Sequence, residues 1–126
     1  MFKKILIIAL FLGTITFAVL QHVYIKNTSD VFLSYCKEAI MYVNADDFDS
    51  AKEKMELINE QWEKSEKTLE ALIEHTEIDN IERSLRLAAS YLESEEKSMF
   101  LSEAQVLTFL FGHIEYIDNI ALENIL

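Results

Sequence analysis

The chain has 126 residues, of which 22 are Asp or Glu and 11 are Lys or Arg, so its formal net charge is −11 at pH 7. This excess of acid argues against nucleic-acid binding, which depends on Lys and Arg side chains that neutralise phosphates. The chain has no Pro and only two Gly, a composition that favours helices and leaves too little glycine for a phosphate-binding loop.

The first feature along the chain is an uncharged segment. Residues 5–25 lie between Lys3–Lys4 and Lys26 and contain no charged side chain. As a helix, this segment spans about 31 Å, close to the thickness of the hydrocarbon core of a bilayer. The sequence therefore predicts a single transmembrane helix in an N-terminal membrane anchor, residues 1–26, with membrane lipid as its partner. The apolar side chains expected to contact lipid are Ile5, Leu6, Ile7, Ile8, Leu10, Phe11, Leu12, Ile15, Phe17, Val19 and Leu20.

The alternative is that this segment is a cleaved signal peptide, in which case the rest of the chain would be a secreted helical protein. The most apolar stretch, residues 5–20, is long for the apolar region of a signal peptide, and no Ala-x-Ala triplet follows it. The sequence therefore favours an uncleaved anchor.

The basic residues predict how the anchor is oriented. Lys3 and Lys4 precede the uncharged segment and Lys26 alone follows it, so the positive-inside rule places the N-terminus in the cytoplasm. The predicted location is thus the cell membrane, with residues 27–126 forming an extracytoplasmic domain. These residues carry eight Lys or Arg and 22 Asp or Glu, a net charge of −14, which repels the domain from anionic lipid.

Apolar residues recur at helical spacing throughout this domain. The sequence predicts an all-α fold, in which a single N-terminal transmembrane helix is followed by an antiparallel up-down bundle of about four helices. The first continues the membrane helix or follows a short break at 27–30, and Asp residues in 44–47 can cap the second. The predicted helices cover Phe32–Val43, Phe48–Leu72, Ile78–Leu92 after a break at 75–77, and about Ser98–Ile114 after a turn at 94–97.

The fourth predicted helix has an unusually wide apolar arc. Phe109 and Tyr116 fall on the side opposite its core residues. A helix of this kind is either the most buried of the bundle or has a second surface to cover. The sequence slightly favours the most buried position, and the alternative makes Phe109 and Tyr116 a candidate face for a protein partner.

The densest polar cluster contains His75, Glu77 and Asp79. A carboxylate beside a His can bind a metal or move a proton, so a metal-dependent sensor or enzyme, with help from His113, is the alternative function. The cluster is a local run rather than a set of converging groups. We therefore expect a loop in which Thr76 or Asp79 caps the third helix, and we predict no catalytic residue, no metal and no cofactor.

Two further side chains have structural interpretations. Trp62 lies on the core-facing stripe of the second helix, so burial against the neighbouring helices is expected. Cys36 is the only cysteine; it can form no internal disulfide, and a buried thiol is expected.

Three segments carry a resemblance to a known family: Trp62-Glu63-Lys64, the run Ile73–Glu82, and the ending Leu122-Glu123-Asn124-Ile125-Leu126. Together with the basic start and the anchor helix, they resemble an uncharacterised bacterial family, the domain-of-unknown-function family 4363, over essentially the whole chain. The resemblance implies a small, membrane-anchored helical protein of Gram-positive bacteria. It transfers no catalytic residues, because no activity is established for the family.

The sequence thus predicts a non-enzymatic, membrane-anchored accessory protein or protein-interaction module outside the cytoplasmic membrane. Its expected partner is a membrane protein or a second copy of the chain. No nucleic acid and no small-molecule substrate are expected.

Overall fold

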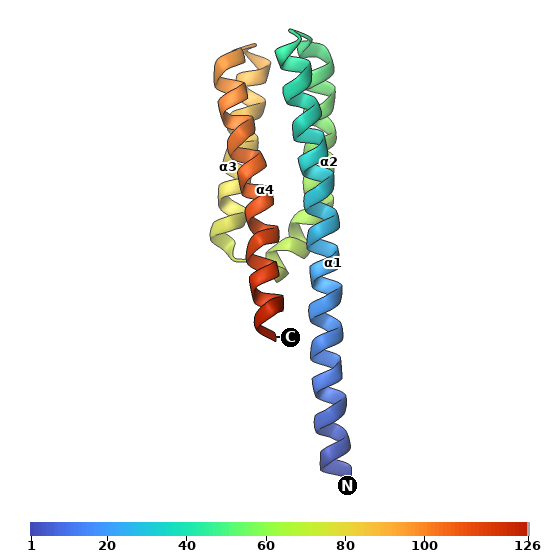
Figure 1. The fold of residues 1–126 in the computed structure, drawn as a ribbon. Helices are drawn as coiled ribbons and strands as arrows, with labels where there is room; N and C mark the ends of the chain where they lie inside the picture. The colour runs from blue at the N-terminus through green and yellow to red at the C-terminus, as the bar shows by residue number, and fades with distance from the viewer. Residues whose placement is uncertain (126) are drawn as a thin grey trace.

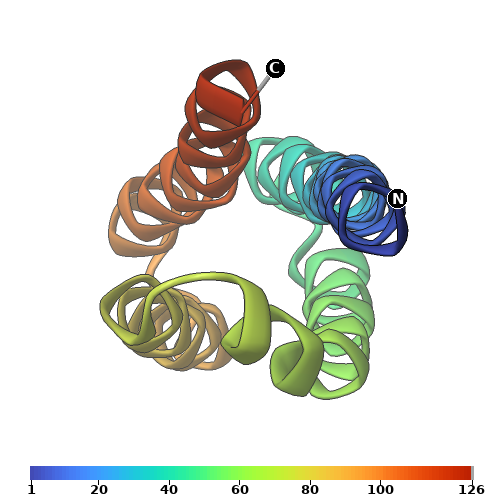
Figure 2. The ribbon, with the colours of Figure 1, turned by 90° about the horizontal axis from the view of Figure 1, so that it is seen from below.

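The computed structural model describes residues 1–125, and Leu126, the last residue of the C-terminal motif, lies outside the described residues. The described chain forms four helices, α1 (Phe2–Asn44), α2 (Phe48–Leu72), α3 (His75–Glu93) and α4 (Lys97–Ile125), joined by short turns (Figure 1). Successive helices run antiparallel, and each packs against two neighbours so that α1 also contacts α4 (Figure 2). The predicted all-α bundle is confirmed.

Helix α1 serves both as the expected anchor and as the first helix of the bundle. It is continuous through residues 27–30, and almost all side chains of its first part, residues 2–20, are exposed. Residues 2–13 project beyond the other helices, whereas the end of α4 lies alongside residues 14–20, where Thr14 and Phe17 share a shallow hollow with Ile125 (Figure 1). The whole exposed segment spans about 28 Å as a helix. Within residues 1–125, α1 is the one helix long and apolar enough to cross a membrane.

The bundle begins before residue 27. Ile25 is 0% exposed within the core, and Gln21 and His22 both contact Asp118 of α4. The last turn of the uncharged segment therefore packs against protein. The end of α4 reaches still further along α1, as far as Thr14, so α1 is uncovered on all sides from residue 2 to residue 13.

The centre of the core is aromatic. The rings of Phe32 and Phe111 stack with centroids 4.3 Å apart, and Trp62 meets them edge-on at 6.1 and 6.4 Å. All three side chains are buried, as expected for Trp62. Three of the four helices thus meet at this cluster.

The turns show one correct and one wrong expectation about capping. Asp47 caps α2, accepting a hydrogen bond from the backbone N–H of Ser50 at 3.1 Å. Neither Thr76 nor Asp79 caps α3, which begins earlier, at His75, with Glu74 at its N-cap and no side-chain cap. The reason is the extended conformation of Ile73, which packs against the core and reverses the chain within two residues.

Helix α4 continues to Ile125, well past its expected end near Ile114. Asp118 occupies the next core-facing position and is buried between α4 and α1. This extension brings the end of α4 alongside α1 next to the projecting segment (Figure 1).

Candidate functional site

The polar cluster singled out in the sequence does not converge in the structure. His75 and Asp79 are exposed in the first turn of α3, whereas Glu77 is turned toward α4. The Glu77 carboxylate is paired with His113, whose Nε2 lies 3.7 Å from Oε1. Among residues 1–125, no group of three or more His, Cys, Asp or Glu side chains is placed to hold a metal ion.

The outer surface of α4 is exposed and aromatic. Phe109 and Tyr116 are 66% and 60% exposed. The expectation that α4 is the most buried helix is therefore wrong. The reason is that α4 packs against α1 and α3 through one side, which leaves its opposite side uncovered.

His113 links the two aromatic side chains. Its ring stacks on Phe109 with centroids 5.5 Å apart, and its other neighbour in the row is Tyr116 at 6.4 Å. The Glu77 carboxylate approaches the same imidazole from α3. His113 thus contacts both Glu77 of the polar cluster and the two aromatic side chains of the candidate partner face.

We define the outer face of α4 as six side chains that line one side of the helix. Besides the three-ring row of 109, 113 and 116, it contains apolar side chains that are 42–49% exposed. An exposed row of large apolar side chains on one helix is typical of an interaction surface. Its members are Met99, Val106, Phe109, His113, Tyr116 and Ile120.

The outer face is almost free of charge although the domain is strongly acidic. Between Lys97 and Glu115, the one formally charged residue of α4 is Glu103. Glu103 accepts a hydrogen bond from the Ser84 hydroxyl of α3 at 2.7 Å, so its carboxylate lies to the side of the face. A partner that covers this face meets apolar and aromatic surface rather than carboxylates.

A second feature lies where α1 leaves the bundle. Nδ1 of His22 is 2.7 Å from Oδ2 of Asp118, and the Gln21 amide donates to the other oxygen at 3.4 Å. Asp118 is only 7% exposed. These contacts connect the C-terminal part of α4 to α1.

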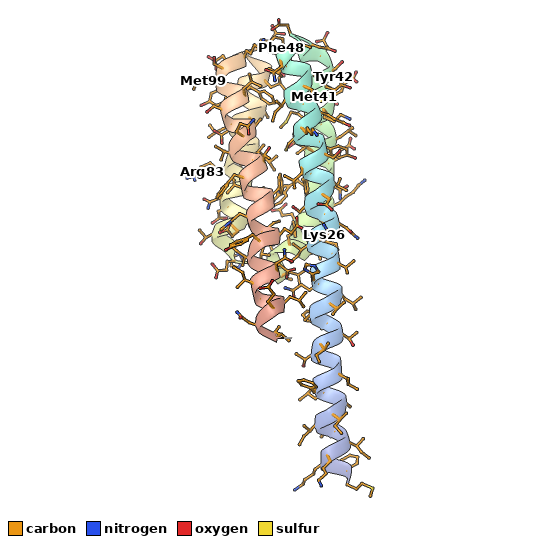
Figure 3. All side chains as sticks on the ribbon, in the orientation of Figure 1. Lys26, Met41, Tyr42, Phe48, Arg83 and Met99 are labelled. Carbon is orange, nitrogen blue, oxygen red and sulfur yellow. The ribbon has the colours of Figure 1, made fainter. Side chains whose placement is uncertain are left out.

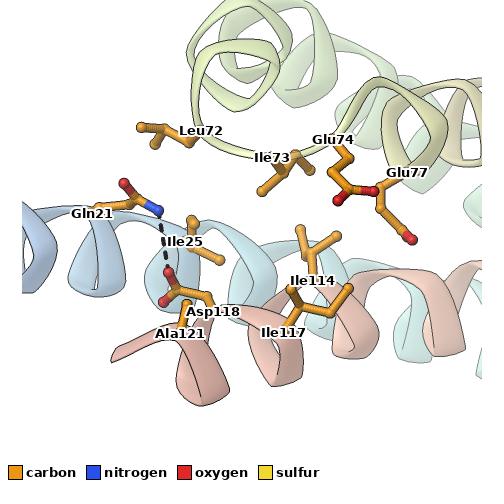
Figure 4. Close-up of a pocket in the computed structure, with 10 residues that line it drawn as sticks. All are labelled: Gln21, Ile25, Leu72, Ile73, Glu74, Glu77, Ile114, Ile117, Asp118 and Ala121. Atoms are coloured by element: carbon orange, nitrogen blue, oxygen red, sulfur yellow. Dashed lines mark hydrogen bonds between the residues drawn. The ribbon is translucent and has the colours of Figure 1, made fainter. Parts of the chain in front are cut away.

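A small cavity lies beside this pair, between α1, α4 and the α2–α3 turn (Figure 4). Its walls include Ile25, Ile73 and Ile114, with the carboxyl groups of Glu77 and Asp118 at its margins. The cavity measures about 120 Å³, well below the roughly 300–1,000 Å³ of common ligand pockets. It can take a small apolar group but no substrate of ordinary size.

The reasoning from sequence missed the His22–Asp118 pair, although one signal was present. Asp118 continues the core-facing stripe of α4, four residues after Ile114 and seven after Phe111. A carboxylate at such a position requires a partner because burying an unpaired charge is costly. The identity of the partner, 96 positions away, cannot be read from helical spacing.

Cys36 is buried, as expected, in the α1 part of the core. Removal from water raises the pKa of its thiol to about 12. Because the thiolate is the reactive form of cysteine, burial of Cys36 disfavours its reaction in the folded protein.

One comparison with known proteins identifies a family for this chain. The family model of a domain of unknown function, DUF4363, matches residues 19–125, so the match begins where α1 enters the bundle. No curated protein and no solved structure matches the chain. Because the matched segment covers most of the chain and the whole four-helix bundle, the protein belongs to the DUF4363 family.

Proposed function

We propose that the protein is a non-enzymatic, single-pass membrane protein. Its acidic bundle is held outside the cytoplasmic membrane and binds a helical protein of the same membrane through the outer face of α4. The observation that carries this proposal is the exposed, uncharged row centred on Phe109, His113 and Tyr116.

The projecting part of α1 supports the membrane location. Its exposed apolar side chains, such as Leu10, Phe11 and Phe17, would each be costly to leave in water, at about 25 cal/mol per Å² of apolar surface. A bilayer removes this cost, and the exposed residues 2–20 together span about 28 Å, close to its hydrocarbon thickness. Lys3 and Lys4 at the start of the helix favour a cytoplasmic N-terminus.

The placement of the polar groups supports a binding role rather than catalysis. His75 and Asp79 are exposed, whereas Glu77 is partly buried and lies beside His113. The surface that the fold leaves uncovered is instead an extended helical face, which suits a partner helix.

The orientation can be tested with a cysteine at each end of the molecule, because the native Cys36 is buried and is not expected to react with a maleimide. In intact cells that express the full chain, a membrane-impermeant maleimide is expected to label Ser94→Cys, in the α3–α4 turn. The matched variant Phe2→Cys is expected to react only after lysis, and the unmodified chain in neither condition. Protection of Ser94→Cys in intact cells, or recovery of a shortened soluble product, would contradict the anchored topology.

The binding role can be tested by photo-crosslinking in native membranes. A photoreactive amino acid in place of Phe109 is expected to give a discrete protein adduct. The same amino acid at Leu87, an exposed position on α3, serves as the matched control and is expected to give none. Equal adducts at both positions, or none at position 109, would remove the docking role of the outer face.

A further inference from the structure

We propose that the partner of the outer face is a second copy of this chain, bound through a parallel pairing of the two α4 helices. This inference rests on the docking role proposed above and adds the identity of the partner. It follows from the spacing of the outer face, the geometry of the anchors and the distribution of charge.

The outer face has the spacing of a coiled-coil seam. From Val106 to Ile120 its members recur at alternating intervals of three and four residues, and Met99 lies seven residues before Val106, with the polar Ser102 at the position between them. In heptad terms, Met99, Val106, His113 and Ile120 occupy a positions, and Phe109 and Tyr116 occupy d positions. This second seam lies on the side of α4 opposite the core residues Phe100, Ala104, Leu107, Phe111 and Ile114, all of which are buried.

The residue types at the a positions suit a pair of helices. Val106 and Ile120 are β-branched, and among parallel coiled coils β-branched residues at a positions favour two strands over three or four. In that arrangement each a residue meets its own counterpart, so His113 faces His113 of the second copy. A single polar residue at an a position fixes the register of such a pair.

The anchors require the same arrangement. α4 runs antiparallel to α1, and the projecting segment lies at one end of the bundle (Figure 1). A two-fold axis parallel to α4 keeps the projecting segments of both copies on the same side, where both can enter one membrane. An antiparallel pairing would place the two segments at opposite ends.

The charge distribution permits two acidic bundles to meet at this face. The positions that flank the seam on one side carry no formal charge; they are Ser98, Gln105, Gly112 and Asn119. The Glu-rich helix α2 lies diagonally across the bundle from α4 (Figure 2). Like charges of the two copies are therefore held apart, and the repulsion between exposed charges more than about 8 Å apart is largely screened by salt.

Other occupants fit this face less well. Met99 lies at the end of the bundle farthest from the projecting segment (Figure 3), so membrane lipid cannot cover the whole seam. A basic protein would find no carboxylate within the outer face. A second copy, in contrast, supplies an identical seam in the same membrane, and this confinement raises the effective concentration of the partner.

Cysteines at the two ends of the seam test both the partner and the direction of pairing. Met99→Cys and Ile120→Cys lie about 31 Å apart along α4. In membranes containing the full chain, mild oxidation is expected to convert most of each variant to a disulfide-linked dimer. Leu57→Cys, exposed on α2, is the matched control for random collision and is expected to remain mostly monomeric. In an antiparallel pair, at most one of the two variants could form a disulfide with its own counterpart. The proposal would be overturned if only one variant gave the linked dimer, or if neither gave more of it than Leu57→Cys.

A disrupting variant and tagged copies separate this inference from the docking role itself. Phe109→Glu in the Met99→Cys background is expected to reduce the linked dimer at least tenfold while circular dichroism stays unchanged, because position 109 contributes nothing to the core. An undiminished dimer would contradict pairing through this seam.

The photo-crosslinking at position 109 is then repeated with two differently tagged copies. An adduct containing both tags supports self-pairing, an adduct with another protein overturns self-pairing but keeps the docking role, and the lack of any adduct overturns both.

Discussion

Replacing Phe111 by Ala is expected to destabilise the bundle by about 3–5 kcal/mol, the usual cost of removing a fully buried aromatic ring. Phe111 is 0% exposed and stacks on Phe32 at 4.3 Å, while Trp62 packs against both rings. The truncation would leave a cavity where α1, α2 and α4 meet. We expect a correspondingly lower urea midpoint for the full chain in mild detergent, followed by circular dichroism.

Phe109 provides the matched control for this prediction. It is the same residue type on the same helix, two positions away, but faces outward. Phe109→Ala is expected to change the free energy of unfolding by no more than about 0.5 kcal/mol, as is usual for an exposed site. The measurement is made at a concentration low enough to keep the chain monomeric. Similar losses for the two variants would mean that α4 is rotated about its axis, so that Phe109 also contacts the core.

The pattern of core residues explains how much of the fold could be predicted. Helix α2 has the predicted bounds because Ala51, Met55, Ile58 and Leu69 repeat at helical spacing and all are buried. The one polar residue on that stripe, Ser65, is also buried and accepts a hydrogen bond from Gln61. Where local spacing alone determines which side of a helix faces the core, the sequence was sufficient.

Two errors in the helix bounds arise where a polar side chain is satisfied by a distant residue. The sequence left open a break in α1 at 27–30, yet Ser29 is fully buried and its hydroxyl donates to the carbonyl oxygen of Phe111 at 2.7 Å. The predicted end of α4 near Ile114 likewise stops short of the buried Asp118, whose partner, His22, comes from the start of the chain. Helical periodicity contains no information about such pairings.

The candidate site was predictable in part for the same reason. Phe109 and Tyr116 could be assigned to an outward side from their angular position, and the structure shows both exposed. The role of His113 could not, since its contact with Glu77 depends on how α3 packs against α4. A His that is one of three scattered through the chain gives no local signal of its position in an aromatic row.

The contact between His22 and Asp118 is expected to hold the C-terminal half of α4 against α1, and its two partners should not be equivalent. His22→Ala leaves a carboxylate that is 7% exposed with only the longer contact to Gln21. Asp118→Ala leaves an imidazole that is 22% exposed and can be hydrated. Leaving a buried polar group without its partner costs about 1–3 kcal/mol, so we expect the His22→Ala variant to be the less stable of the two.

A double-mutant cycle on the full chain in mild detergent measures this contact. We expect the double variant to lose less stability than the two single variants together, with a coupling of about 0.5–3 kcal/mol.

The end of α4 should also become more sensitive to protease in each single variant, since the contact lies only seven residues before Ile125. Lys26→Gln, which removes exposed ion pairs to Asp30 and Glu115 nearby, is the control and should leave the urea midpoint unchanged because such pairs contribute little. If His22→Ala behaves like Lys26→Gln, the end of α4 is held by its apolar contacts alone, and the pair has no structural role.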